Sequence, residues 1–289
     1  MVTLENDLLK VCIREKGAEL TSVINKLNGT EYLWQADAQV WPWHAPNLFP
    51  VVGACLNKQV LLDGVFYPME RHGFARNKDF YVLETTKTHA KFSLPYNTET
   101  FKVYPYKFTF QVLYDLFDTG LRVSFKVINQ DNKAIYFSMG AHPAFNVPLN
   151  QGEGFEDYYL EFEQEEPLEK HLLSAEGFFT GKTEPVPVKE RKVYLTRELF
   201  EKDALVFKNI RSKKVFLKHV KNNYSVSVSY TNFNYLGIWT KPDANFVCIE
   251  PWLGCADTEG NAVDLKHKEA IQQVEHGHVF EADFTIGIH

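Results

Sequence analysis

Apolar and polar residues alternate with a period of two along most of the chain, a pattern typical of half-buried β-strands. The alternation is clearest over Phe108–Tyr114 and Leu121–Val127, with the turn residues Asp118-Thr119-Gly120 between them. Two such segments joined by a short turn predict a long antiparallel hairpin. Alternation also covers Leu9–Arg14 near the start and Phe280–Ile288 near the end, so strands are expected throughout the chain.

Turn signals and the weakly patterned segments complete the fold prediction. Asn28-Gly29 and Asp63-Gly64 each lie between strand-like segments, which predicts two-residue hairpin turns. Helical periodicity is confined to short pieces such as Thr196–Phe200, which argues against helical crossovers and a parallel sheet. Gln151–Lys192 has the weakest pattern, and we expect it to be a long excursion between sheets. The fold class is therefore all-β, with antiparallel sheets packed as a sandwich or barrel in a single domain over residues 1–289.

The composition of the chain indicates which binding partners and which cellular compartment to expect. The chain has 289 residues, a net charge of −6 and no basic cluster beyond pieces such as Arg211–Lys214, so nucleic acid is not an expected partner. No apolar run approaches the about 18 residues of a membrane helix, and the first residues lack a signal-peptide core. The four cysteines show no CxxC spacing, which is typical of reduced thiols. We expect a cytoplasmic protein that is a monomer or a homodimer and does not bind membranes.

The first candidate chemical group is His142, which ends a strand-like run over Ala134–Ala141 and is followed by Pro143. The alternation places the imidazole on the same face as Ser138 and Gly140, whose small side chains leave room for a ligand. Proline is expected to stop the strand directly after the histidine. A single histidine at a strand end more often only hydrogen-bonds a loop, so this residue alone does not define a site.

The second candidate is Glu250, at the end of the apolar run Asn245–Ile249 and directly before Pro251. A carboxylate at the end of an apolar strand is costly to bury unless another group pairs with it. It could be a salt-bridged carboxylate at the rim of the sheet, or a general base whose pKa is raised by apolar surroundings. Trp252 could stack against a sugar ring, although a tryptophan more often belongs to the core.

The third candidate is the cationic loop Arg71–Arg76, in which His72 and Gly73 lie between two arginines. Its many donors suit hydroxyl, carboxylate or phosphate groups, although an exposed basic loop is the simpler interpretation. No nucleotide-binding glycine motif and no GxSxG elbow occurs in the chain. His276 and His278 alternate on a predicted strand without a third ligand nearby, so no metal is expected.

These stretches together resemble the aldose 1-epimerase (galactose mutarotase-like) family, nearest to bacterial mutarotase-related proteins found beside lactose-utilisation genes. The resemblance runs nearly from end to end. The motifs that carry it follow in order: Asn47–Gly53, His72–Arg76, His142–Phe145 and Glu250–Trp252. It implies a large antiparallel β-sandwich, a supersandwich, and an isomerase that interconverts the α and β anomers of a hexose such as galactose. A small-molecule sugar is the implied partner, with no cofactor.

The resemblance also implies roles for individual residues. His142 matches the family's general acid and Glu250 its general base, whereas His72 and Arg76 match substrate-binding residues. Asp203 resembles, more loosely, the aspartate that holds sugar hydroxyls. The chain departs from the family at Ala54-Cys55-Leu56, where many members carry an arginine soon after the preceding glycine. Arg76 or Arg71 could replace that donor, so the departure puts the sugar in doubt more than the chemistry.

The chemistry of anomerisation fits such a pair independently. One group removes the proton of the O1 hydroxyl while another protonates the ring oxygen, and each contributes roughly 10²–10⁴-fold. His142 would have to start protonated, and we expect a nearby carboxylate to hold its pKa near or above neutrality. Three alternatives remain open: a hexose-6-phosphate mutarotase, because guanidinium groups suit phosphate; a non-catalytic carbohydrate-binding sandwich; and a glycosidase with two carboxylates.

Overall fold

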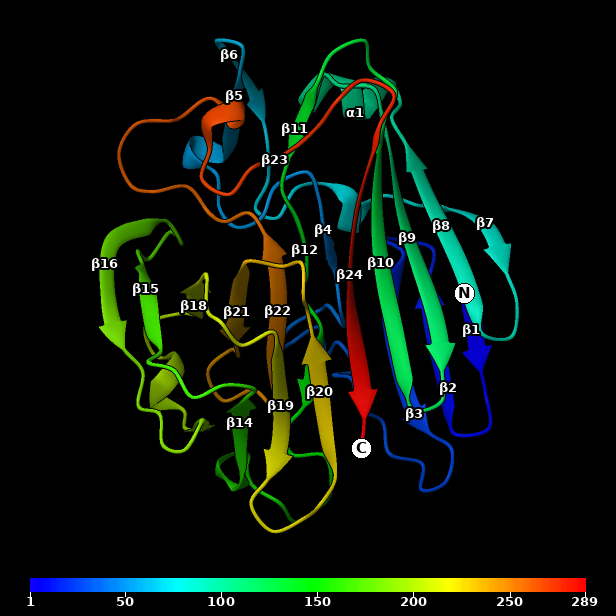
Figure 1. Ribbon diagram of the computed structural model, residues 1–289, viewed down its shortest axis with the longest axis vertical. Helices are drawn as coiled ribbons and strands as arrows, with labels where there is room; N and C mark the ends of the chain where they lie inside the picture. The colour runs from blue at the N-terminus through cyan, green and yellow to red at the C-terminus, as the bar shows by residue number, and fades with distance from the viewer.

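The computed structural model describes residues 1–289, and its two large sheets are antiparallel (Figure 1). The nine-stranded sheet has the order β17-β14-β19-β20-β24-β10-β9-β8-β7. In that order its strands are Lys192–Tyr194, Tyr158–Phe162, Lys214–His219, Ser225–Ser229, Val279–Ile288, Gly120–Asn129, Phe108–Phe117, His89–Pro95 and Tyr81–Thr85. The predicted all-β antiparallel fold is confirmed.

The eight-stranded sheet has the order β16-β15-β18-β21-β22-β12-β4, with β13 also paired to β22. Its strands are, in that order, Phe179–Pro185, Glu169–Leu173, Leu205–Lys208, Tyr235–Trp239, Phe246–Leu253, Met139–Ala141 and Asn47–Leu48, and β13 is Ala144–Asn146. Every residue of β22 is buried, so this strand crosses the interior of the molecule rather than its surface.

Smaller elements surround the two sheets. A three-stranded sheet contains β1 (Val2–Glu5), β2 (Leu9–Arg14) and β3 (Glu19–Asn25), and two-stranded sheets pair β5 (Gln59–Leu62) with β6 (Val65–Pro68) and β11 (Ile135–Phe137) with β23 (Gln272–Val274). The helices are α1 (Thr98–Val103) and the 3₁₀ turns η1 (Leu56–Lys58), η2 (Ala75–Asn77), η3 (Phe155–Asp157), η4 (Glu198–Phe200) and η5 (Leu265–His267). No helix is long and apolar enough to cross a lipid bilayer.

One apolar core joins the two large sheets. It includes Phe110 and Phe125 from the nine-stranded sheet and Ile238 and Ile249 from the eight-stranded sheet, all fully buried. This core of 66 residues extends from Leu4 to Ile288. Its continuity supports our proposal that residues 1–289 form a single domain.

The predicted hairpins have different outcomes. β9 and β10 pair from Phe108↔Asn129 to Phe117↔Gly120, so the predicted long hairpin is confirmed. The Asp63-Gly64 turn is also confirmed, because β5 and β6 pair up to Leu62↔Val65 and both turn residues have positive φ.

The two-residue turn predicted at Asn28-Gly29 is wrong. β3 ends at Asn25, the Gly29 N–H donates to its carbonyl at 2.8 Å, and the chain returns antiparallel to β3 only through the isolated bridge Ile24↔Glu31. The side chains of Asn25 and Asn28 accept hydrogen bonds from the N–H groups of Leu27 and Thr30. These local bonds stabilise a longer turn than the dipeptide predicts.

Two further predictions need correction. The continuous strand Ala134–Ala141 is divided at Ser138, whose N–H donates to the Pro50 carbonyl at 2.7 Å, so β11 and β12 belong to different sheets. The weakly patterned segment Gln151–Lys192 passes between the two large sheets as predicted, but it also adds strands to both: β14 joins the nine-stranded sheet and the β15–β16 hairpin joins the eight-stranded sheet. Both errors arise because strand pairing across distant segments decides which residues form a sheet.

Candidate active site

His142 and Glu250 face each other across adjacent strands. β12 pairs with β22 through Gly140↔Trp252, and β13 pairs with the same strand through Ala144↔Cys248. The two pairs share one register, so His142, in the interruption between β12 and β13, lies directly opposite Glu250. Residues opposite each other on neighbouring strands have Cβ atoms only about 5 Å apart.

Pro143 and Pro251 do not end their segments as expected. Extended backbone resumes at β13 after Pro143, and β22 continues through Pro251 to Leu253. The Ile249 N–H donates to the Pro143 carbonyl, so the nitrogen of Pro251 faces the same neighbouring chain. The neighbouring segment is itself interrupted between β12 and β13. A sheet tolerates a proline, which lacks an N–H donor, at such an interruption. Glu250 therefore lies inside a strand, not at its end.

The two side chains are in direct contact and nearly inaccessible. His142 Nε2 lies 3.1 Å from Glu250 Oε2, and the residues are 7% and 1% exposed. His142 Nδ1 and Glu250 Oε2 form no regular hydrogen bond within the protein. The Trp41 ring stacks on the imidazole with centroids 5.0 Å apart, and Trp239 approaches it edge-on. The aromatic rings exclude water from one side of the pair.

Burial favours the neutral forms of both groups. It lowers the pKa of His142 to about 3, with the nearby charge of Arg76 acting in the same direction. It raises the pKa of Glu250 well above its usual value, and the negative charge of Asp203 adds to the effect. The expectation that a carboxylate holds the His142 pKa near neutrality is wrong, because burial lowers this pKa. Both shifts favour a pair without net charge.

His72 lies beside this pair and has a defined tautomer. The Gly53 N–H donates to His72 Nδ1 at 3.1 Å, so a neutral ring carries its proton on Nε2. Its ring meets the His142 ring edge-on with centroids 5.5 Å apart. Burial lowers its pKa, and the charges of Arg76 and Arg71 add to this effect. Gly73 follows at φ 73°, and an added Cβ would collide with the Phe49 carbonyl.

The two arginines of the same loop are held differently. Arg76 donates to the Arg71 carbonyl at 2.9 Å, and its guanidinium lies over the Trp43 ring at 5.1 Å. Arg71 is exposed and donates to the Glu176 carbonyl of the β15–β16 turn. Both line the cavity described below, which is consistent with either one replacing the family's missing arginine.

Asp203 lies in the loop between η4 and β18, in an unusual backbone conformation for a non-glycine residue (φ 88°). One of its carboxylate oxygens, Oδ1, accepts the N–H of Ala204 at 2.7 Å. Its charge raises the pKa of Glu250, so the two carboxyl groups interact electrostatically.

A cavity of about 730 Å³ brings all five predicted residues together. His72, Arg76, His142, Asp203 and Glu250 line it and come from four separate parts of the chain. Sequence analysis missed the wall formed by the β15–β16 hairpin and the two aromatic rings on His142. Those lining residues are Trp41, Leu172, Leu173, Ser174, Ala175, Gly177, Phe179 and Trp239. Among these residues, only Trp41 stands out in the sequence, because it lies in the aromatic stretch Trp41-Pro42-Trp43.

Trp252 also lines the cavity, and two glycines make room for its indole. A Cβ on Gly140 or Gly237 would lie 2.6 or 2.7 Å from indole carbons, so neither position accepts a larger residue without a shift. The ring is only 6% exposed, and its N–H has no regular hydrogen bond. This donor lies near Glu250 and lowers the pKa of that carboxyl group, and the flat ring suits a sugar.

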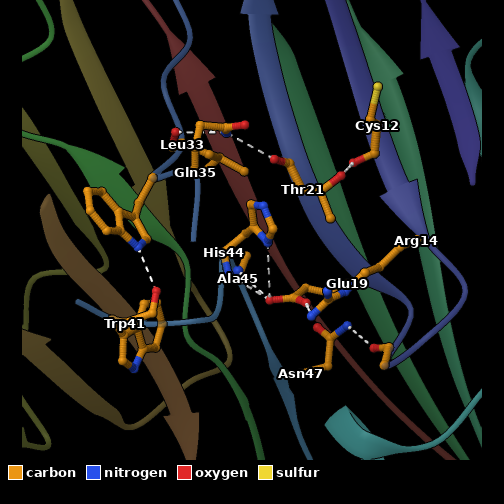
Figure 2. A network of polar contacts seen from close by, with 12 residues as sticks. Cys12, Arg14, Glu19, Thr21, Leu33, Gln35, Trp41, His44, Ala45 and Asn47 are labelled. Carbon is orange, nitrogen blue, oxygen red and sulfur yellow. Dashed lines mark hydrogen bonds and ion pairs between the residues drawn. The ribbon is translucent and has the colours of Figure 1, made fainter. Parts of the chain in front are cut away.

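A second buried carboxylate secures the segment that carries Trp41. Glu19 accepts the N–H groups of His44 at 2.8 Å and Ala45 at 3.0 Å and is ion-paired with Arg14 (Figure 2). The Trp34 indole donates to the Trp41 carbonyl at 2.9 Å in the same network. These contacts fix the loop before β4 and thus the ring that stacks on His142.

The chain is similar in sequence and in structure to several known proteins. A sequence model of the family described as aldose 1-epimerase matches residues 1–286. Protein LacX (chromosomal) of Lactococcus lactis subsp. lactis is 34% identical over 276 residues, which are 92% of each chain. A galactose mutarotase related enzyme from Lactobacillus acidophilus superimposes with a TM-score of 0.94 at 37% identity, covering 100% of this chain and 97% of that one. A galactose mutarotase-like protein from Lactobacillus casei gives 0.95 at 34% identity, covering 100% of both chains.

Proposed function

The chain belongs to the aldose 1-epimerase family, and from this premise we propose that it interconverts the α and β anomers of a hexose through His142 and Glu250. The family makes the protein a sugar isomerase; the residue roles and the hexose are our proposal. The observation that carries it is the buried contact of His142 with Glu250 at a cavity also lined by His72, Arg76 and Asp203.

The proton of the neutral pair moves before the reaction. Sugar hydroxyls that enter the cavity replace the solvation that burial removed, and the proton passes from Glu250 to His142 across the 3.1 Å contact. The pair then consists of a carboxylate and an imidazolium. Glu250 is the general base and His142 the general acid.

Ring opening then proceeds with balanced proton transfers. Glu250 takes the O1 proton, the O1–H electrons form the C1=O bond, and the C1–O5 bond breaks. His142 gives its proton to O5 as the bond electrons move there. Rotation about C1–C2 presents the other face of the aldehyde, and the reverse transfers close the ring. His72 and Arg76 donate hydrogen bonds to the sugar, and Asp203 accepts them from its hydroxyls.

The test is anomer equilibration followed by polarimetry or proton NMR, starting from fresh α-D-glucose or α-D-galactose. We expect acceleration over buffer, and its loss in Glu250→Gln. The matched control is Glu166→Gln, a buried carboxylate that accepts the backbone N–H groups of Arg211 and Ser212 away from the cavity. No acceleration with any common aldose, or full activity in Glu250→Gln, would overturn the proposal.

A hexose 6-phosphate is the second candidate substrate, and two cations favour it. Arg71 and Lys202 line the same cavity and are exposed, so they can meet a phosphate there. A higher kcat/KM for the phosphorylated hexose, reduced selectively in Arg71→Gln, would support this candidate. Equal or poorer turnover would exclude it.

Two further proposals concern the setting of the activity. Saturable sugar binding without anomerisation would instead favour the non-catalytic binding protein, with Trp252 as its stacking surface.

The four cysteines are free thiols, which supports our proposal that the protein works in the reducing cytoplasm.

A further inference from the structure

Cys248 carries a buried thiol that the proposed reaction does not use. It precedes Glu250 by two residues on β22, so the two side chains point to the same face of the strand. The Cys248 thiol, a ring nitrogen of His142 and a carboxylate oxygen of Glu250 all lie within 4.8 Å of one another. A sulfur, a nitrogen and an oxygen therefore converge on one point beside the cavity.

This donor set matches the chemistry of zinc. Zn²⁺ binds thiolate, imidazole and carboxylate at about 2.0–2.3 Å, which places neighbouring ligand atoms roughly 3.5 Å apart in a tetrahedron. The three ligand atoms would need to approach one another by about 1 Å. Three protein ligands leave a fourth coordination position that water can fill.

Two further observations point to a ligand at this place. His142 Nδ1 is buried without a hydrogen bond, although buried polar atoms are rarely left unpaired. The cavity reaches both residues, so an ion can enter through it, whereas Cys248 itself is fully buried behind them. A dication with one thiolate and one carboxylate also forms a site without net charge, which burial favours.

We propose that Zn²⁺ binds His142, Cys248 and Glu250 and reversibly inhibits the enzyme. Binding releases the thiol proton and the carboxyl proton to solvent, and it occupies the acid and the base together. The site is inhibitory rather than a cofactor site. The inhibition rests on the proposed function, whereas the binding does not.

Calorimetry on chelator-treated protein tests the binding directly. One Zn²⁺ should bind per chain, with at least tenfold weaker affinity in Cys248→Ser. Cys255→Ser is the matched control, because Cys255 is equally buried but lies outside this cluster, and its affinity should equal that of the parent. Co²⁺ should give a thiolate-to-metal charge-transfer band that Cys248→Ser loses. Mg²⁺, which prefers oxygen ligands, should not bind.

The outcomes separate the site from the function. Unchanged Zn²⁺ affinity in Cys248→Ser, or no thiolate band with Co²⁺ in the folded parent protein, would overturn the site. Anomerisation that falls with added Zn²⁺, recovers with chelator and resists Zn²⁺ in Cys248→Ser supports the whole proposal. Binding through Cys248 in a protein that anomerises no sugar keeps the site and overturns the function.

Discussion

Glu19 and Glu250 are equally buried carboxyl groups in two regions of the same fold, each 1% exposed. Burial raises the pKa of both. Glu19 faces a permanent cation, Arg14, and two backbone N–H groups that cannot move away. Glu250 has only the Trp252 indole as a nearby donor within the protein, and it touches an imidazole that can gain or lose a proton. Fixed donors make a carboxylate structural, whereas a titratable partner beside a cavity makes it reactive.

Replacing Glu250 should have the largest effect of all on activity. Glu250→Gln keeps the shape but removes the base, so kcat should fall roughly 10²–10⁴-fold. The free energy of unfolding should change by less than about 1 kcal/mol, because no fixed donor loses its partner. Polarimetry and urea denaturation measure the two quantities. A strongly destabilised variant with normal kcat would show that Glu250 resembles Glu19.

Replacing Glu19 should reverse that pattern. Glu19→Gln leaves Arg14 without its counter-ion, and breaking a buried pair is costly even for an arginine side chain that is 29% exposed. The free energy of unfolding should fall by about 2 kcal/mol, less than for a fully buried pair. Activity should fall less than in Glu250→Gln. Urea denaturation gives the answer, and an unchanged midpoint would refute a structural role.

Acid should weaken the Glu19 region through its neighbour His44. Burial and the charge of Arg14 lower the pKa of His44 to about 4. Between pH 6.5 and 4 the unfolded chain binds a proton at this residue that the folded chain does not. Stability is therefore lost as the pH falls, by up to about 1.4 kcal/mol per pH unit. The stability difference between the parent and His44→Gln should change in this window, and a pH-independent difference would contradict the pKa direction.

The smallest expected effect concerns the charge that Asp203 places near Glu250. Asp203→Asn removes a contribution that raises the Glu250 pKa, so this pKa should fall. The variant should also lose hydrogen-bond strength to the sugar, worth about 1 kcal/mol or roughly fivefold in kcat/KM. The pH profile of kcat/KM measures both changes. A profile identical to that of the parent would remove Asp203 from the site.

The sequence predicts local features better than long-range ones. The β9–β10 hairpin follows from alternation and a turn, so its residues identify it without the rest of the chain. The break at Ser138 and the assignment of β15–β16 to the cavity wall depend on distant pairing partners. The five site residues came from motif resemblance, and their meeting at one cavity could not be derived from spacing alone. The His142 pKa was mispredicted because burial, which outweighs the carboxylate, is not visible in a motif.

Because His142 and Glu250 lie opposite each other on neighbouring strands, the proposed activity depends on the correct register of these strands. A slip of one residue between these strands would send the two side chains to opposite faces of the sheet. Misfolded molecules that keep their strand content would then look normal by circular dichroism and yet be inactive. Specific activity would thus report the fraction of correctly assembled chains during refolding.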